Sequence, residues 1–169
     1  TASKAQWQAA LRAVAYSNTS DAPTTTERTI RYEINDGAQS ASPVTSTITV
    51  TASNDAAVIT GAQTASLTET DAAQSTGGTL NVSDVDSAAT FEEQTNTAGS
   101  NGYGEFNLST AGVWTYTMNA AQNQFVDGQI YTDSFTAAAA DGTAQIVTVS
   151  ITGTNDAAVI VGVSTASLT

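Results

Sequence analysis

Cysteine and histidine are absent from this sequence of 169 residues, and Lys plus Arg number only 4. Without Cys or His the chain cannot form disulfides, zinc sites of the usual kind, thiol nucleophiles or a Ser-His-Asp triad. A surface that follows nucleic-acid phosphates must be cationic, whereas the formal net charge here is −12. No apolar run approaches the roughly 20 residues of a membrane-spanning helix. We therefore expect no nucleic-acid partner and no membrane insertion.

Acidic side chains run along the whole chain, but basic ones are confined to its start. Every Lys and Arg lies within the first 31 positions, so residues 32–169 carry fourteen carboxylates and no basic side chain. Such a stretch repels itself when it folds, unless salt screens it or bound cations neutralise it. The two possibilities can coexist, and the sequence leaves both open.

An internal repeat organises the chain. Residues 54–68 and 155–169 share 12 of 15 residues at an offset of 101, and both begin with Asn-Asp-Ala-Ala. An offset of one domain length predicts tandem modules, and the chain, which begins at Thr1, is expected to be an excerpt of a longer protein. The predicted parts are the C-terminal part of one module in 1–53, a linker in 54–57, a complete module in 58–153, a linker in 154–158 and the first strand of a third module in 159–169.

Alternating apolar and polar residues between turn signals predict an all-β sandwich of the immunoglobulin or cadherin-like class over 58–153. Within it, Trp114, Tyr116 and Met118 alternate with threonines, so we assign these large side chains to the core. One short helix is expected in the N-terminal fragment, where Ser3 and Gln6 have the spacing of a capping box. Seven strands are expected in the complete module, at 58–68, 79–83, 89–95, 103–109, 113–118, 130–139 and 144–152.

A series of motifs in fixed order over 58–157 resembles the VCBS repeat of the RTX-type giant surface adhesins of bacteria. Residues 7–37 are similar to the cadherin-like repeats that accompany VCBS repeats. The VCBS motifs are Gly102-Tyr103-Gly104, Gly112-Val113-Trp114-Thr115-Tyr116, Asp133-Ser134-Phe135-Thr136, Asp141-Gly142-Thr143 and Val149-Ser150-Ile151-Thr152-Gly153-Thr154-Asn155-Asp156.

The resemblance implies tandem domains that are secreted by type I export, lie at the bacterial cell surface and are stiffened by Ca²⁺ at their joints. It also implies that the adjoining repeats of the same chain are partners. Many relatives have Pro where this chain has Ala57 and Ala158. Because a linker without Pro loses a fixed φ angle, its rigidity here should depend more strongly on bound metal.

The expected topology gathers acids at both poles of the complete module. Successive loops alternate between the N-terminal pole, where the chain enters the module, and the C-terminal pole, where it leaves. The N-terminal set consists of loop acids and the incoming linker, namely Asn54, Asp55, Asp84, Asp86 and Asp141. The C-terminal set consists of loop acids and the outgoing linker, namely Glu69, Asp71, Asp133, Asn155 and Asp156.

Carboxylates crowded at one pole repel one another unless a cation neutralises them. Oxygen ligands without His or Cys favour calcium or magnesium over zinc, and flexible loops suit the irregular six- to eight-fold coordination of calcium. Asp84-Val85-Asp86 also resembles the Asp-x-Asp motif with which cadherins bind calcium between domains. It is not an EF-hand, because the Gly and the bidentate Glu of that loop are missing. The sequence therefore predicts Ca²⁺ sites formed by the ten residues of the two polar sets.

Simpler interpretations exist for the same residues. The Asp-Gly pairs that begin at Asp36 and Asp141 are turn signals, and an Asn-Asp pair can cap the end of a strand. Glu92 and Glu93 are neighbours on an expected strand and should point to opposite faces, so we do not expect them to act as an acid/base pair. Because no set of catalytic groups converges, we expect no enzyme.

These observations predict a structural extender of a secreted bacterial adhesin that serves cell adhesion and biofilm formation. Two alternatives stay open. A lectin-like module would bind surface glycans by stacking sugars on Tyr103, Trp114 or Tyr131. A filament subunit would bind other copies of itself, with residues 159–169 completing a neighbour's open sandwich by strand addition.

Overall fold

A computed structural model describes residues 2–35, 37–158 and 162 of the chain. The chain divides into two compact units, Thr1–Asp55 (unit 1) and Ala56–Thr169 (unit 2). Asp36 and the predicted strand 159–169, apart from Gly162, lie outside the described residues. Among the residues described, no helix has the length and apolar character needed to cross a membrane.

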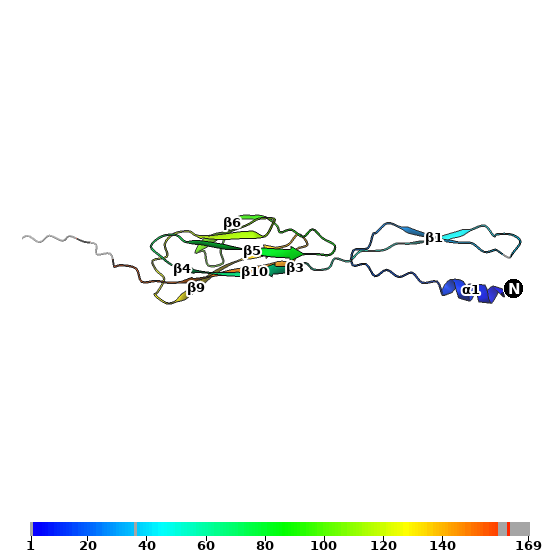
Figure 1. The fold of residues 1–169 in the computed structure, drawn as a ribbon, viewed down its shortest axis with the longest axis horizontal. Helices are drawn as coiled ribbons and strands as arrows, with labels where there is room; N and C mark the ends of the chain where they lie inside the picture. Colours follow the sequence, from blue (N-terminus) through cyan, green and yellow to red (C-terminus); the bar gives the residue numbers. More distant parts are fainter. Residues whose placement is uncertain (1, 36, 159–161, 163–169) are drawn as a thin grey trace, which may run out of the picture. The chain divides into compact units, whose positions relative to one another are not determined.

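Unit 1 consists of one helix and one β-hairpin (Figure 1). Helix α1 (Lys4–Arg12) begins at the predicted capping box, in which the Ser3 amide donates to Gln6 Oε1 at 2.8 Å and the Gln6 amide donates to Ser3 Oγ at 3.3 Å. Strand β1 (Arg28–Tyr32) pairs antiparallel with β2 (Val44–Ile48). No residue described in this unit is fully buried, so unit 1 has no hydrophobic core of its own.

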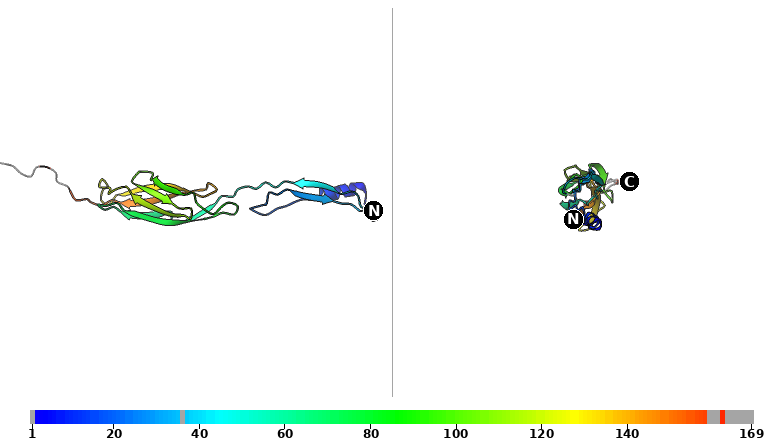
Figure 2. Two further views of the ribbon diagram at one scale, coloured as in Figure 1. Left: turned by 90° about the horizontal axis from the view of Figure 1, so that it is seen from above. Right: turned by 90° about the vertical axis from the view of Figure 1, so that its right-hand side faces the viewer.

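Unit 2 is a β-sandwich in which a five-stranded and a three-stranded sheet lie face to face (Figure 1). The five-stranded sheet has the order β3-β5-β8-β7-β6, the three-stranded sheet has the order β4-β10-β9, and their strands run side by side (Figure 2). The predicted all-β fold is confirmed. The bounds are β3 (Val58–Gly61), β4 (Thr64–Thr68), β5 (Ser75–Ser83), β6 (Gln94–Ala98), β7 (Gly104–Leu108), β8 (Val113–Met118), β9 (Ile130–Ala138) and β10 (Ala144–Thr152).

The first predicted strand, 58–68, is divided between the two sheets. Its first half, β3, pairs antiparallel with β5, whereas its second half, β4, pairs parallel with β10. Gly61 ends β3 with a φ of +101°, and a Cβ added there would lie 2.5 Å from the carbonyl oxygen of Thr79. A glycine is therefore required where the chain crosses from one sheet to the other.

The predicted third strand, 89–95, is wrong in position, because β6 begins only at Gln94. Phe91 is buried and forms an isolated bridge with Ala139 at the end of the opposite sheet. The neighbouring amide of Glu92 donates to the Ala138 carbonyl at 2.9 Å. This segment is thus held against β9 before the chain reaches the five-stranded sheet.

The core of unit 2 lies between the two sheets and contains the predicted alternating residues of β8. Trp114, Tyr116 and Met118 are buried, and the Trp114 indole N–H donates to the Ala62 carbonyl at 2.8 Å. The ring of Phe106 lies 4.6 Å from that of Phe135, centroid to centroid, in a stacked arrangement. The facing strand β10 adds buried aliphatic side chains, namely Val147, Val149 and Ile151.

The outer edge of β9 is covered although no strand runs beside it over its length. Successive carbonyl groups on that edge accept hydrogen bonds from the segment that contains β6. The donors are the Asn101 side chain to Thr132 O at 2.7 Å, the Ser100 amide to Ser134 O at 2.9 Å, the Gln94 side chain to Thr136 O at 2.8 Å and the Glu92 amide to Ala138 O at 2.9 Å.

The two tryptophans provide a test of where stability resides. Trp114 is fully buried and Trp7 is 46% exposed. Trp114→Ala should lower the free energy of unfolding by about 3–5 kcal/mol, because it opens a cavity in the core. Trp7→Ala, as the matched control, should change it by less than about 0.5 kcal/mol. Urea denaturation followed by circular dichroism measures both values, and equal losses would contradict this account of the core.

Candidate functional site

Asp84 and Asp86 lie in the loop that follows β5. The Asp84 Oδ1 atom accepts the backbone N–H groups of Asp86 at 2.9 Å and Ser87 at 2.7 Å. These two hydrogen bonds lower the pKa of Asp84 below 3.8, and repulsion from Asp141 opposes them. The other oxygen, Oδ2, is buried and accepts no hydrogen bond from the described part of the chain. The loop therefore holds an ionised carboxylate with one oxygen available to a ligand.

Asp141 lies in the turn between β9 and β10. Its Oδ1 atom accepts the Thr143 amide at 2.8 Å, which confirms the turn interpretation, and Gly142 has a φ of +88°. Its Oδ2 atom accepts the Ala57 amide at 2.9 Å and the Thr143 hydroxyl at 2.6 Å. Asp141 thus ties the first residues of unit 2 to the same pole as Asp84.

Glu69 follows β4 and is completely buried. Its amide donates to the Thr152 carbonyl at 2.8 Å, which continues the parallel pairing of β4 with β10. Its Oε2 atom accepts the hydroxyl of Thr154 at 2.7 Å. The Oε1 atom is buried without a hydrogen bond to any described residue. A buried carboxylate oxygen of this kind is costly unless another group satisfies it.

Asp156 lies at the same pole as Glu69, in the segment that follows β10. Both of its carboxylate oxygens are buried, and neither accepts a hydrogen bond within the ranges that the structure describes. Loss of hydration raises the pKa of Asp156 above 3.8, and the adjacent Asp71 carboxyl and the charge of Glu69 raise it further. The charges of Glu69 and Asp71 therefore act on Asp156 and disfavour its ionised form.

The two Asn-Asp pairs have the same local geometry. The Asn54 side-chain amide donates to the Asp55 carbonyl at 2.9 Å, and that of Asn155 donates to the Asp156 carbonyl at 3.2 Å. At this one contact the two Asn-Asp pairs of the repeat therefore agree in conformation as well as in sequence. Among the described residues, no group of three or more acids is placed so that it could hold a metal ion, so the predicted polar sets do not form a ready-made metal site there.

Asp133 does not lie with the acids of the C-terminal pole, where we expected it. It is fully buried on β9, and its two oxygens accept five hydrogen bonds. Because its oxygens are already satisfied, this carboxylate supports the fold and is not a metal ligand in this arrangement. The donors are the backbone N–H groups of Asn101, Tyr103, Gly104 and Ser134 and the hydroxyl of Tyr116.

The hydrogen bonds around Asp133 also constrain Tyr116 and Gly99. Burial raises the pKa of the Tyr116 hydroxyl, and the charge of Asp133 raises it further, so Tyr116 stays a hydrogen-bond donor. A Cβ added to Gly99 would lie 2.1 Å from the Asp133 carboxylate. The loop between β6 and β7 is therefore built around this one buried acid.

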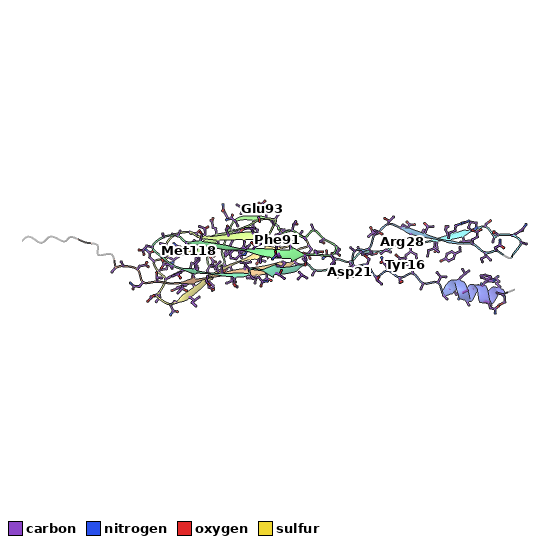
Figure 3. The ribbon with its side chains drawn as sticks, viewed as in Figure 1. Tyr16, Asp21, Arg28, Phe91, Glu93 and Met118 are labelled. Carbon is purple, nitrogen blue, oxygen red and sulfur yellow. The ribbon has the colours of Figure 1, made fainter. Side chains whose placement is uncertain are left out.

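Thr154 contacts the candidate site residue Glu69, and our sequence reasoning did not single it out. Its hydroxyl contacts Glu69, and the corresponding position before the first Asn-Asp pair is Ser53, which also carries a hydroxyl. The hydroxyl that Ser53 and Thr154 share was the signal in the sequence that could have identified Thr154. In unit 1, Ser53 and Asp55 line a polar hollow of about 330 Å³ together with Asp21, which is labelled in Figure 3. Asp21 was likewise not predicted as a polar-set residue.

The aromatic residues of the lectin hypothesis are engaged with other groups. Trp114 is fully buried and its indole N–H is bonded to a backbone carbonyl. The Tyr131 ring stacks on Phe125 with centroids 3.7 Å apart, and Tyr103 meets Phe125 edge-on at 4.8 Å. Trp114 therefore has no face available to a sugar, and one face of Tyr131 is already covered.

Comparison with known proteins gives one family. The sequence profile of the bacterial cadherin-like domain matches residues 54–154, which is more than half of the chain. The match covers unit 2 rather than residues 7–37, where we had placed the cadherin-like similarity. Among proteins with curated descriptions, none matches the sequence.

Substitution of Asp133 separates its structural role from a metal-binding one. Asp133→Asn should lower the free energy of unfolding by about 3 kcal/mol, because an amide cannot accept all five hydrogen bonds of the carboxylate. Tyr116→Phe removes one of these donors and should cost about 1 kcal/mol. Urea denaturation should give the same losses in calcium and in chelator, whereas a loss confined to calcium would restore Asp133 as a metal ligand.

Proposed function

The chain belongs to the bacterial cadherin-like domain family, and from this premise we propose that it is an extender segment of a bacterial surface adhesin, stiffened by calcium where its modules meet. Membership of this family indicates an adhesin-type extracellular domain. Secretion by type I export, the VCBS and RTX character of the parent protein and a role in biofilms are the finer parts of the proposal. They are supported by the motif resemblance in 58–157.

The C-terminal pole of unit 2 carries the proposal. Glu69 Oε1 and both oxygens of Asp156 are buried and accept no hydrogen bond from the residues described there. A divalent cation held by Glu69, Asp71 and Asp156 would satisfy these oxygens and offset their mutual repulsion. The donor set consists of oxygen atoms alone, so it fits calcium better than zinc. This single observation of buried, unsatisfied carboxylate oxygens is the main support for a cation site.

The N-terminal pole of unit 2 carries a second set of possible cation ligands, for which the structural support is weaker. Asp84 Oδ2 is buried without a hydrogen bond from the described residues, and Asp86 belongs to the same loop. Through Ala57, whose amide is bonded to Asp141, the chain leads directly back to Asn54 and Asp55. We propose that these two linker residues add ligands to the loop acids.

The function that follows is mechanical. When bound, calcium would supply positive charge that draws linker and loop carboxylates together and so reduces the freedom of the joint. Without it the same carboxylates repel, because the sequence after Arg31 contains no Lys or Arg to neutralise them. Extracellular calcium modules bind at roughly 10⁻⁴ to 10⁻³ M. Such sites fill outside the cell and stay empty in the cytoplasm, so the array would stiffen only after export.

Calcium should stabilise the folded chain. With a dissociation constant of roughly 10⁻⁴ to 10⁻³ M, about 10 mM calcium should add about 1–3 kcal/mol per site to the free energy of unfolding. Glu69→Gln should remove most of this gain, because an amide is a weaker calcium ligand. Differential scanning calorimetry in calcium and in chelator measures the difference.

The matched control for this measurement is Glu93→Gln. It removes the same charge at an exposed site on the face of the sandwich (Figure 3). Glu93→Gln should keep the full calcium response. Identical melting curves with calcium and with chelator for the unsubstituted chain would overturn the proposal, as would small-angle scattering profiles that do not change.

The ionised carboxylates of Asp156 and Asp84 should contribute to the stability of the calcium-free fold with opposite signs. The pKa of Asp156 is raised in the folded state, so its charge destabilises the calcium-free fold above that pKa, and the penalty is relieved as pH falls toward 3.8. Asp156→Asn should therefore raise the calcium-free melting temperature at pH 7 yet lower the calcium-bound one. In chelator, the increase in melting temperature caused by Asp156→Asn should disappear as the pH is lowered toward 3.8.

The pKa of Asp84 is lowered, so its charge contributes stability above 3.8 that is lost as pH falls through the folded pKa. Asp84→Asn should accordingly lower the calcium-free melting temperature at pH 7. Melting curves between pH 3 and 7 test both signs, and two variants that shift in the same direction would contradict the assignment.

A further inference from the structure

The turn that leads from β6 to β7 contains an Asn-Gly pair, Asn101-Gly102. No other asparagine in the sequence is followed by glycine. An asparagine in such a pair can lose ammonia spontaneously, because glycine has no side chain to keep its backbone nitrogen away from the neighbouring side-chain carbonyl carbon. Both residues are exposed in unit 2, so water and hydroxide can reach them.

The reaction consumes only water. The Gly102 backbone nitrogen loses its proton to hydroxide and attacks the Cγ atom of Asn101. The new C–N bond closes a five-membered imide, and the C–N bond of the side-chain amide breaks as ammonia leaves with a proton from water. A further water opens the imide at one of its two carbonyl groups, which gives either aspartate or isoaspartate. Overall, an amide and one water become a carboxylate and an ammonium ion, with no oxidation or reduction.

The closed turn opposes this attack at the nitrogen. The Gly102 amide donates to the Gly99 carbonyl at 3.0 Å, which is the hydrogen bond that closes a four-residue β-turn. The nitrogen can attack only after its proton has left, and this bond holds the proton in place. Breaking the bond is therefore a first requirement for the reaction.

The side chain of Asn101 is held as well. Its Nδ2 atom donates to the Thr132 carbonyl of β9 at 2.7 Å, and its backbone N–H donates to Asp133 Oδ1 at 2.8 Å. Departure of Nδ2 as ammonia breaks the first of these bonds. The contact with β9 therefore opposes the reaction at the leaving group, as the β-turn bond opposes it at the nucleophile.

Three further amides keep the turn closed. The Ser100 amide donates to the Ser134 carbonyl at 2.9 Å. The amides of Tyr103 and Gly104 donate to Asp133 Oδ2 at 3.0 Å and 3.1 Å. Together with the two amides described above, five consecutive backbone N–H groups are engaged, so opening the turn breaks several hydrogen bonds at once.

We propose that Asn101 is a site of spontaneous deamidation that the closed turn blocks, so that the reaction proceeds only in molecules whose 99–104 turn has opened. Its rate is then proportional to the fraction of molecules in the open state. This inference goes beyond the proposed function, because it requires neither a cation nor a neighbouring module.

The product cannot restore the closed turn. A carboxylate at position 101 has no N–H group to donate to the Thr132 carbonyl, and it places a second negative charge close to Asp133. In isoaspartate the main chain is also one carbon longer at this position, which displaces the amides of Tyr103 and Gly104 from Asp133. An opening that lasts long enough for the reaction therefore becomes permanent.

Peptide mapping by mass spectrometry, during incubation at mildly alkaline pH, tests the protection of Asn101. The folded chain should deamidate at this residue at least about tenfold more slowly than the same chain unfolded in urea. Equal rates in the folded and the unfolded chain would overturn the proposal. This comparison needs no substitution.

Asp133→Asn tests whether the buried carboxylate keeps the turn closed. It should speed deamidation of Asn101 in the folded chain by about threefold or more, because the turn loses the charged acceptor of three of its amides. Fragment spectra separate position 101 from the new asparagine. Val147→Ala, the matched control, also weakens the core, but Val147 has no hydrogen-bonding side chain. It should leave the rate within about twofold, and equal acceleration by the two variants would contradict local opening of the turn.

Asn101→Asp supplies the aspartate product directly. In chelator it should lower the melting temperature by about 4–8 °C, because a hydrogen bond to β9 is replaced by repulsion. Asn123→Asp, the matched control, adds the same charge at an exposed position between β8 and β9 and should change the melting temperature by less than about 2 °C. Equal shifts would show that the product does not hold the turn open. These measurements do not involve calcium, so this proposal and the calcium proposal fail separately.

Discussion

Burial of carboxylate oxygens in a sequence with no basic residue after Arg31 is the constraint on which this module depends. Each buried acid must be satisfied either by N–H and O–H groups of the chain or by a cation from outside. Asp133 takes the first route, with five hydrogen bonds around one carboxylate. Glu69 and Asp156 retain oxygens with no such donor in the described chain. This division separates the acid that builds the fold from the acids for which we propose a cation.

Local patterns were sufficient to predict most of the fold. The alternation around Trp114 and Tyr116 predicted β8 and its buried face, because side chains on a strand alternate whatever lies around them. The repeat at an offset of 101 predicted two equivalent linkers, and both Asn side chains make the same hydrogen bond. The start of β6 was missed because Phe91 is held by Ala139, a contact 48 positions away that leaves no local signature.

The positions of the acids in the two polar sets could be predicted from the sequence only where the order of the loops determines them. Alternation of loops between poles correctly brought Asp84 near Asp141 and Asp156 near Glu69, since the electrostatic effects on their pKa values require proximity. Asp133 was misplaced because its partners are mostly backbone N–H groups of residues 101–104. Backbone donors are present at almost every residue, so the sequence does not indicate which carboxylate they will bind.

The covered edge of β9 has a consequence for a protein built of repeats. If similar modules are joined in tandem, as we propose, each meets its neighbour at a local concentration of the order of millimolar, where exchange of strands between modules competes with correct folding. The bonds from Glu92, Gln94, Ser100 and Asn101 occupy the carbonyl groups through which an adjacent module could misassemble. In a tandem array of the kind proposed above, the segment 92–101, which contains β6, would thus protect the edge of β9 from pairing with a neighbouring module.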